Sequence, residues 1–295
     1  MFGIRSDGRR LKGADPIVMV TPYIMPTRVD AQNFCTLMLD YDPLVRYIKE
    51  KRLQGHNMTF MTIILAAYVR VVSQCPELNR FVSNKQIFAR NRISVSFVVI
   101  KGGENGEVPE ESVVKVEFDP GDTIFKVEEK IRQAIALGRG EGKDTPLANR
   151  LASVMLSIPG LATLVVTLAR VLDRYGLLPG FLYDASPFHT SLFISNMASL
   201  NMGSIYHHLY NFGTTSVFLA LGKVERSLQP LPGGKTGYKN QLPLGVTTDE
   251  RIMGGANYAR CFEVMREFFK NPALLETPPE MIRTETKMRP ARPVR

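Results

Sequence analysis

The sequence predicts an α/β sandwich in which a β-sheet is packed by helices. Segments with alternating apolar residues, which are typical of strands, are interleaved along the chain with segments that carry a helical apolar stripe. Hydrophobic residues make up 44% of the 295 residues and charged residues 22%, which is ordinary for a globular protein and excludes a wholly disordered chain. This length allows one large domain or two small ones.

Three segments in the N-terminal part have recognisable patterns. Residues 17–39 mix apolar and polar side chains with two prolines, which predicts a strand broken by a loop. Asp42 and Pro43 predict the start of a helix that ends near Gly55. The run from Thr59 to Val72 is apolar almost throughout, so we predict a helix that is buried on most sides.

The remaining elements follow from periodicity. Strands are predicted at residues 87–88, 93–100, 113–118, 192–195, 217–224 and 242–248. Helices are predicted from Asp122 to Ile135 and from Ala256 to Lys270, because each segment carries one apolar stripe.

Residues 138–187 fall outside this plan and are predicted to form an apolar helical insertion. Residues 151–169 contain 19 uncharged residues, which meets the length criterion for a membrane-spanning helix. Pro159-Gly160 divides this run and favours two short helices in a hairpin. Three interpretations stay open: a buried insertion, a hairpin that enters one membrane leaflet, and a true span. Residues 151–183 are therefore the segment that we expect to meet a membrane surface, if the protein meets one.

The chain has 37 lysine and arginine residues against 28 acidic residues, a net charge of +9. This excess suits a phosphorylated ligand, an anionic membrane surface or a solvated basic tail. Prolines and charges over residues 277–295 predict a disordered basic tail, and residues 1–15 are expected to form an N-terminal arm. The basic residues are not interleaved with aromatic residues as in a nucleic-acid-binding module, so no nucleic-acid partner is expected.

Cys35, Cys75 and Cys261 are widely spaced and form neither a CxxC pair nor a Cys/His cluster. A disulfide framework and a structural metal site are therefore not expected. The first ten residues carry charges where a signal peptide would need an apolar core. These features favour a cytoplasmic protein, either free or peripheral to a membrane.

Five short patches occur in the order that one known family shows. They are Pro-Glu-Leu-Asn at 76–79, Phe-Ile-Ser-Asn at 193–196, Gly-Lys-Val-Glu at 222–225, Asp-Glu-Arg-Ile-Met-Gly-Gly-Ala at 249–256 and Asn-Pro-Ala-Leu-Leu-Glu at 271–276. In this order they resemble the catalytic domain of the 2-oxoacid dehydrogenase dihydrolipoyl acyltransferases, which are relatives of chloramphenicol acetyltransferase. The resemblance implies a chloramphenicol acetyltransferase-like two-layer sandwich with a mixed sheet over residues 16–276. It also implies a homotrimer with its active sites between subunits.

The resemblance further implies an acyl-transfer chemistry. In that family, a histidine takes the proton from the thiol of coenzyme A or dihydrolipoamide, and a serine donates a hydrogen bond to the tetrahedral oxyanion. The serine position corresponds to Ser195 and the histidine position to Glu250. The residue that supports the histidine corresponds to Gly254, which has no side chain to offer.

The change from histidine to Glu250 leaves three hypotheses open. A glutamate has a reference pKa about two units below that of histidine, which makes removal of a thiol proton harder by roughly 2.7 kcal/mol. Glu250 is then a working base for a different nucleophile, or His207 or His208 has taken over as the base. In the third hypothesis the chain has kept the trimeric scaffold and lost the chemistry.

We therefore predict a coenzyme A-dependent acyltransferase that moves an acyl group between a small-molecule donor and a small-molecule acceptor. The alternative is a non-catalytic trimeric scaffold or regulatory protein. The domain-like region begins near residue 16, so no lipoyl domain is expected and a free coenzyme A thioester is the expected donor. The insertion directly precedes the Ser195 strand, where it is placed to admit a lipid-like acceptor or to dock the trimer on a membrane.

Overall fold

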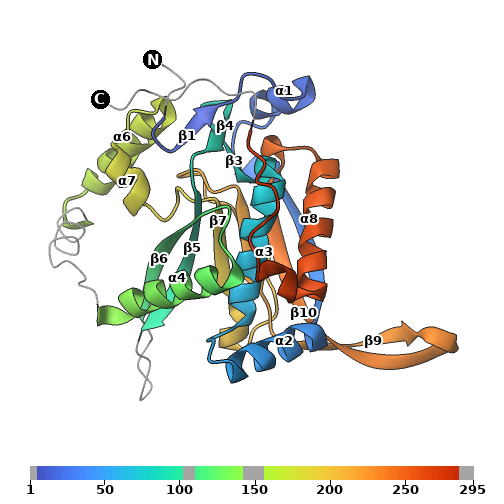
Figure 1. Cartoon of the computed structure of the whole chain (residues 1–295). Helices are drawn as coiled ribbons and strands as arrows, with labels where there is room; N and C mark the ends of the chain where they lie inside the picture. Colours follow the sequence, from blue (N-terminus) through green and yellow to red (C-terminus); the bar gives the residue numbers. More distant parts are fainter. Residues whose placement is uncertain (1–4, 102–109, 142–155, 286–295) are drawn as a thin grey trace.

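A computed structural model describes residues 5–101, 110–141 and 156–285 of the chain (Figure 1). Its main sheet has the strand order β2-β10-β8-β7-β5-β6. The bounds are β2 (Gln32–Asp40), β10 (Lys235–Asp249), β8 (Val217–Leu221), β7 (Leu192–Asn196), β5 (Ile93–Lys101) and β6 (Glu110–Phe118). Strand β7 runs parallel to both of its neighbours, whereas the other pairs are antiparallel. The expectation of an α/β fold with a mixed sheet is confirmed.

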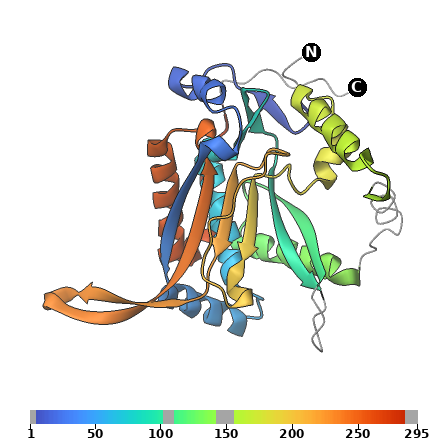
Figure 2. The ribbon, with the colours of Figure 1, turned by 180° about the vertical axis from the view of Figure 1, so that it is seen from behind.

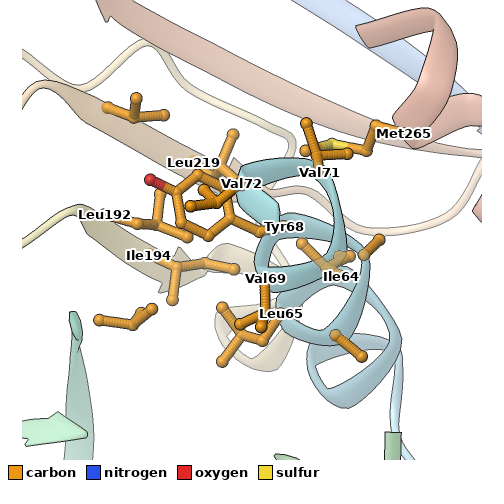
Figure 3. Packing of buried hydrophobic residues seen from close by; sticks show 14 of the residues in the cluster. Ile64, Leu65, Tyr68, Val69, Val71, Val72, Leu192, Ile194, Leu219 and Met265 are labelled. Atoms are coloured by element: carbon orange, nitrogen blue, oxygen red, sulfur yellow. The ribbon is translucent and has the colours of Figure 1, made fainter. Parts of the chain in front are cut away.

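One face of this sheet is covered by helices (Figure 1). They are α2 (Tyr41–Leu53), α3 (Phe60–Gln74), α4 (Ile124–Ala136) and α8 (Gly255–Lys270). The central helix, α3, begins as predicted because the Thr59 hydroxyl accepts a hydrogen bond from the backbone N–H of Thr62. Its side chains pack on the sheet; Figure 3 shows Tyr68 against Leu192 and Leu219. This layer is the hydrophobic core.

The opposite face carries no helix and is here called the open face. Along β7, Leu192 and Ile194 belong to the helix-facing core, so Phe193 and Ser195 point to the open face. The segment 203–216 crosses this face instead of a helix (Figure 2). It passes so close that a Cβ atom on Gly245 would lie 2.2 Å from the carbonyl oxygen of Ile205.

A small sheet and a hairpin extend the main layer. The small sheet has the order β1 (Gly8–Arg10), β4 (Gln86–Arg90) and β3 (Arg80–Ser83). Strand β9 (Glu225–Leu231) pairs with the first half of β10, and this hairpin projects from the body of the molecule (Figure 2). The sequence analysis predicted neither β1 nor the hairpin.

The N-terminal part of the segment 17–39 differs from the prediction. Residues Pro16–Ile24 form helix α1, whereas a strand was expected there. The Asp15 carboxylate accepts a hydrogen bond from the backbone N–H of Ile17 at 2.8 Å, and Pro16 occupies the first helical position. These two local signals start a helix where the mixed apolar and polar pattern predicted a strand.

The insertion is helical in its described part, where it contains α6 (Leu161–Tyr175) and α7 (Gly180–Ala185). The chain breaks where Pro159-Gly160 predicted it, with Gly160 in the left-handed conformation at φ 81°. Within α6 only Asp173 is buried in the single chain. In the described parts of the chain, no helix is both long and apolar enough to cross a bilayer. Residues 142–155 lie outside the described residues.

The C-terminal segment, expected to be disordered from residue 277, is held on the domain as far as Glu285. The backbone N–H of Arg283 donates to the carbonyl oxygen of Ser73 at 2.8 Å, and Arg70 donates to the carbonyl oxygen of Thr277. Glu285 forms an ion pair with Arg80. Composition alone does not show these anchors, because their partners lie about 200 residues earlier. Residues 286–295 lie outside the described residues.

Candidate active site

Ser195 lies near the end of β7 with its side chain on the open face. Its Oγ atom is buried and has no hydrogen-bond partner in the described structure. The residue opposite Ser195 on β8 is Ala220, and the residue opposite Ala220 on β10 is Gly245. Buried hydroxyls are nearly always hydrogen-bonded, so this hydroxyl is available to donate to a bound group.

Glu250 lies in a 3-10 turn, Glu250–Ile252, directly after β10. The turn is fixed by buried Asp249, whose Oδ1 accepts from Nε of Arg251 at 2.8 Å and whose Oδ2 accepts from Nη2 of Arg251 at 2.8 Å. Arg28 adds a second positive charge, with its Nε 3.5 Å from Oδ2 of Asp249. Glu250 itself is exposed. The neighbouring ion pairs therefore hold the backbone and leave the Glu250 carboxylate at the surface.

Gly254 lies at the N-cap of helix α8 with φ −72°, which any residue can adopt. A Cβ atom there would have no neighbour within 4 Å. An aspartate therefore fits at this position without displacing other atoms.

Ser195 and Glu250 lie at opposite ends of the sheet within one chain. Through Ala220, Ser195 is level with Gly245, and Asp249 lies four residues further along β10 than Gly245. At the rise of an extended strand, these four residues alone span about 13 Å. One chain therefore does not bring Ser195 and Glu250 together, and a site that uses both requires a second copy.

His207 lies on the same face as Ser195. Its ring stacks on Phe218 of β8 with centroids 4.0 Å apart and an interplanar angle of 7°. Its Nδ1 lies 2.7 Å from the carbonyl oxygen of His208, so Nδ1 carries the proton and Nε2 is the acceptor in the neutral ring. Burial lowers the pKa of His207, which favours this neutral form. His208 is exposed, so of the two histidines His207 is the one that packs against the sheet.

A buried ionic network, which the sequence analysis missed, lies beside α6. Asp173 Oδ1 accepts from Arg5 Nη2 at 2.6 Å and lies 3.3 Å from His189 Nε2. His189 Nδ1 is 2.8 Å from the hydroxyl oxygen of Ser186. Burial would raise the pKa of Asp173, but the neighbouring His189 and the charge of Arg5 outweigh it and hold the pKa at about 2. No sequence pattern pointed to this network, because Arg5 and Asp173 are 168 positions apart.

No group of three or more histidine, cysteine or acidic side chains could hold a metal ion in the described part of the chain. The candidate site therefore has three polar groups: the hydroxyl of Ser195, the imidazole of His207 and, at the far end of the sheet, the carboxylate of Glu250.

The strand order and the helix-covered sheet define the fold class of the chloramphenicol acetyltransferase-like proteins. In this chain, Ser195 and Glu250 lie at the two ends of that sheet. One solved structure with this fold is chloramphenicol acetyltransferase, which is 11% identical and matches over 89% of this chain and 100% of that chain with a TM-score of 0.54. The cubic core of the pyruvate dehydrogenase multienzyme complex is 14% identical over 88% of each chain, with a TM-score of 0.54. A probable dihydrolipoamide acetyltransferase from Listeria monocytogenes is 12% identical over 88% of this chain and 93% of that chain, with a TM-score of 0.53.

At these identities the likeness establishes the fold. Neither a family model nor a curated protein matches the sequence.

Proposed function

We propose that the protein is a coenzyme A-dependent acyltransferase with an altered active site. The observation that carries this proposal is the buried, unpartnered Oγ of Ser195 on the open face, in a fold that solved acetyltransferases share. A hydroxyl in this state is suited to donate to an oxyanion as negative charge develops on a thioester carbonyl. The direct test is thioester consumption by the purified protein, followed with a thiol reagent over a series of acyl-coenzyme A donors.

The proposed reaction uses one base and one hydrogen-bond donor. The base takes the proton of the acceptor's nucleophilic group, which then attacks the carbonyl carbon of the thioester. The tetrahedral oxyanion accepts a hydrogen bond from Ser195 Oγ. The carbon–sulfur bond then breaks, and the coenzyme A thiolate takes the proton from the base.

In the proposed assembly, a homotrimer, the base is Glu250 of a neighbouring subunit. Exposed apolar side chains on the open face support contact with a second copy there, since Phe34 and Tyr206 are each 52% exposed and their rings lie 5.6 Å apart. His207 is the second candidate for the base, because it already lies on the Ser195 face of the same chain.

A non-catalytic scaffold is the second proposed function. It is favoured by the exposure of Glu250 and by the absence of a side chain at Gly254. A scaffold would keep the fold and the subunit contacts without consuming a thioester.

The double variant Glu250→His/Gly254→Asp should separate these two functions. If the channel for the substrates is intact, an imidazole at position 250 should raise the rate of thioester consumption about tenfold, because it is a stronger base than a carboxylate toward the acceptor's nucleophilic group. The open space at Gly254 makes a well-folded variant the expectation. The control is Glu250→Gln/Gly254→Asp, which should show no gain. Failure of any thioester to react with either the wild type or the histidine variant would favour the scaffold.

We also propose that the protein works in the cytoplasm, peripheral to a membrane that α6 contacts. Leu164, Leu168, Val171 and Tyr175 recur on one side of this helix, and Leu164 and Leu168 are 65% and 55% exposed. An exposed apolar stripe on a helix that also carries a basic flank, here Arg170 and Arg174, is typical of helices that lie in the membrane interface.

Vesicle flotation tests this contact. With phosphatidylcholine vesicles that contain phosphatidylglycerol, the variant Leu164→Ser/Leu168→Ser should float about tenfold less than the wild type, because it loses apolar area that would be buried in the interface. The matched control is Leu53→Ser/Leu137→Ser, which removes leucines that are 90% and 64% exposed elsewhere. Equal flotation of both variants and the wild type would rule out α6 as the contact.

A further inference from the structure

A cavity of about 450 Å³ lies between the turn after α1, the β3–β4 hairpin and α6. Five basic side chains from separate segments line it: Arg28, Lys85, Arg170, Arg174 and Arg251. We call this cavity the basic pocket. Its volume is in the range of pockets that hold small organic ligands.

The charges in the basic pocket are not balanced by carboxylates of the described residues. Asp173 is the one carboxylate in its lining, and it already pairs with Arg5 and His189. Arg28 and Arg251 share one carboxylate, that of buried Asp249.

The other three basic residues make no ion pair with any described acidic residue. Arg174 Nε donates to the amide oxygen of Asn84 at 3.0 Å, and Lys85 lies 5.6 Å from the ring centre of Tyr23. Arg170 is exposed on the same side of α6 as Arg174, one helical turn earlier. Lys85, Arg170 and Arg174 thus line one cavity without a carboxylate partner among the described residues.

The donors at the cavity wall suit a phosphate group. Arg28 is almost fully buried; its Nη1 and Nη2 donate to the carbonyl oxygens of Tyr210 and Val82, and its Nε, 3.5 Å from Asp249, makes no hydrogen bond. The side-chain oxygen of Asn211 accepts from the backbone N–H of Arg28 at 3.2 Å, which leaves the Asn211 NH2 group as a further donor. Guanidinium groups bind phosphate oxygens through two parallel hydrogen bonds, and a phosphate would supply the missing negative charge.

We propose that the basic pocket binds a phosphate-bearing ligand, which spans the cavity between α6 and the buried Arg28. The pocket depends on Arg170 and Arg174, and these belong to the insertion rather than to the segments that carry Ser195 and Glu250. The ligand is either a free phosphate compound or the headgroup of an anionic phospholipid at a membrane that α6 contacts. Binding in this pocket does not require acyl transfer, so its test uses no acyl donor.

Calorimetric titration of the full chain with inorganic pyrophosphate at low ionic strength is the first test. The variant Arg170→Gln/Arg174→Gln should bind pyrophosphate at least about tenfold more weakly than the wild type, since charge-assisted hydrogen bonds are lost. The matched control is Arg46→Gln/Arg132→Gln, which removes the same charge from exposed positions on α2 and α4 and should bind like the wild type. Equal thermal midpoints of the two double variants would show that the α6 substitutions do not act through unfolding.

Flotation with phosphatidylglycerol vesicles, compared with pure phosphatidylcholine vesicles, distinguishes a free phosphate compound from a lipid headgroup as the ligand. Binding of pyrophosphate without selective flotation on phosphatidylglycerol would assign a free phosphate compound. Selective flotation that pyrophosphate displaces and that Arg170→Gln/Arg174→Gln weakens would assign a lipid headgroup. The proposal is overturned if neither probe binds, or if the Arg46→Gln/Arg132→Gln control weakens binding equally.

Discussion

Replacement of Ser195 by alanine is expected to lower the rate of thioester consumption by about two to three orders of magnitude, the usual effect of removing one oxyanion donor. The Oγ atom has no partner in the folded chain, so its loss should leave the free energy of unfolding nearly unchanged. Ser96→Ala is the matched control, because Ser96 lies opposite Phe193 on the same face and its buried hydroxyl also lacks a partner. The control should keep the wild-type rate. Equal rates for both variants would contradict the role of Ser195.

Mixed oligomers show whether the site is shared between subunits. Ser195→Ala and Glu250→Gln should each be nearly inactive as pure proteins, if Glu250 is the base. When the two are unfolded together and reassembled at random, about a quarter of the sites of a cyclic trimer would combine an intact Ser195 with an intact Glu250. The mixture should then regain about a quarter of the wild-type rate. Sedimentation of the reassembled protein checks that trimers have formed.

The same experiment identifies the alternative base. If Glu250→Gln keeps the wild-type rate while His207→Gln loses it, the base is His207 and the site lies within one chain. Mixing Ser195→Ala with His207→Gln should then restore nothing, because no chain in the mixture carries both residues.

Replacement of Asp173 by alanine is expected to lower the free energy of unfolding by about 1–3 kcal/mol, because buried Arg5 loses one of its two carboxylate partners and keeps only Asp7. Arg5 Nη2 lies 2.6 Å from Asp173, and the side chains of Arg5 and Asp173 are 2% and 11% exposed. Urea denaturation measures the loss. The control is Asp184→Ala on α7, where the ion pair with Arg92 is exposed and should contribute less than about 1 kcal/mol.

The Asp173 contribution should also depend on pH. Its pKa of about 2 in the folded protein lies below the ordinary value of 3.8, so the folded state favours the ionised carboxylate. The ionised carboxylate therefore contributes about 2 kcal/mol to the free energy of unfolding. This contribution is fully present above about pH 4 and is lost as the pH falls toward 2. The wild type should therefore lose more stability than Asp173→Ala over this range. Parallel curves for the two proteins would contradict the network.

Local patterns in the sequence were sufficient for the central helix and for most strands. The buried helix α3 was predicted from the apolar run that starts at Thr59, and the strand that carries Ser195 was predicted almost to its last residue. Such elements depend on the periodicity of neighbouring residues, which the sequence displays directly. Helix α1 was not predicted, because residues 17–39 mix apolar and polar side chains with prolines; its start depends on the cap at Asp15.

The sequence by itself determined an α/β chain with Ser195 on a strand and Glu250 in a turn, and the order of its patches indicated the fold. Only the tertiary structure decided that Ser195 and Glu250 lie at opposite ends of one sheet, that His207 shares a face with Ser195, and that the stripe on α6 is exposed. It alone assembled the Arg5–Asp173 pair and the basic pocket. The physical reason is that strand register, helix docking and charge pairing depend on residues far apart in the chain, which no local pattern relates to one another.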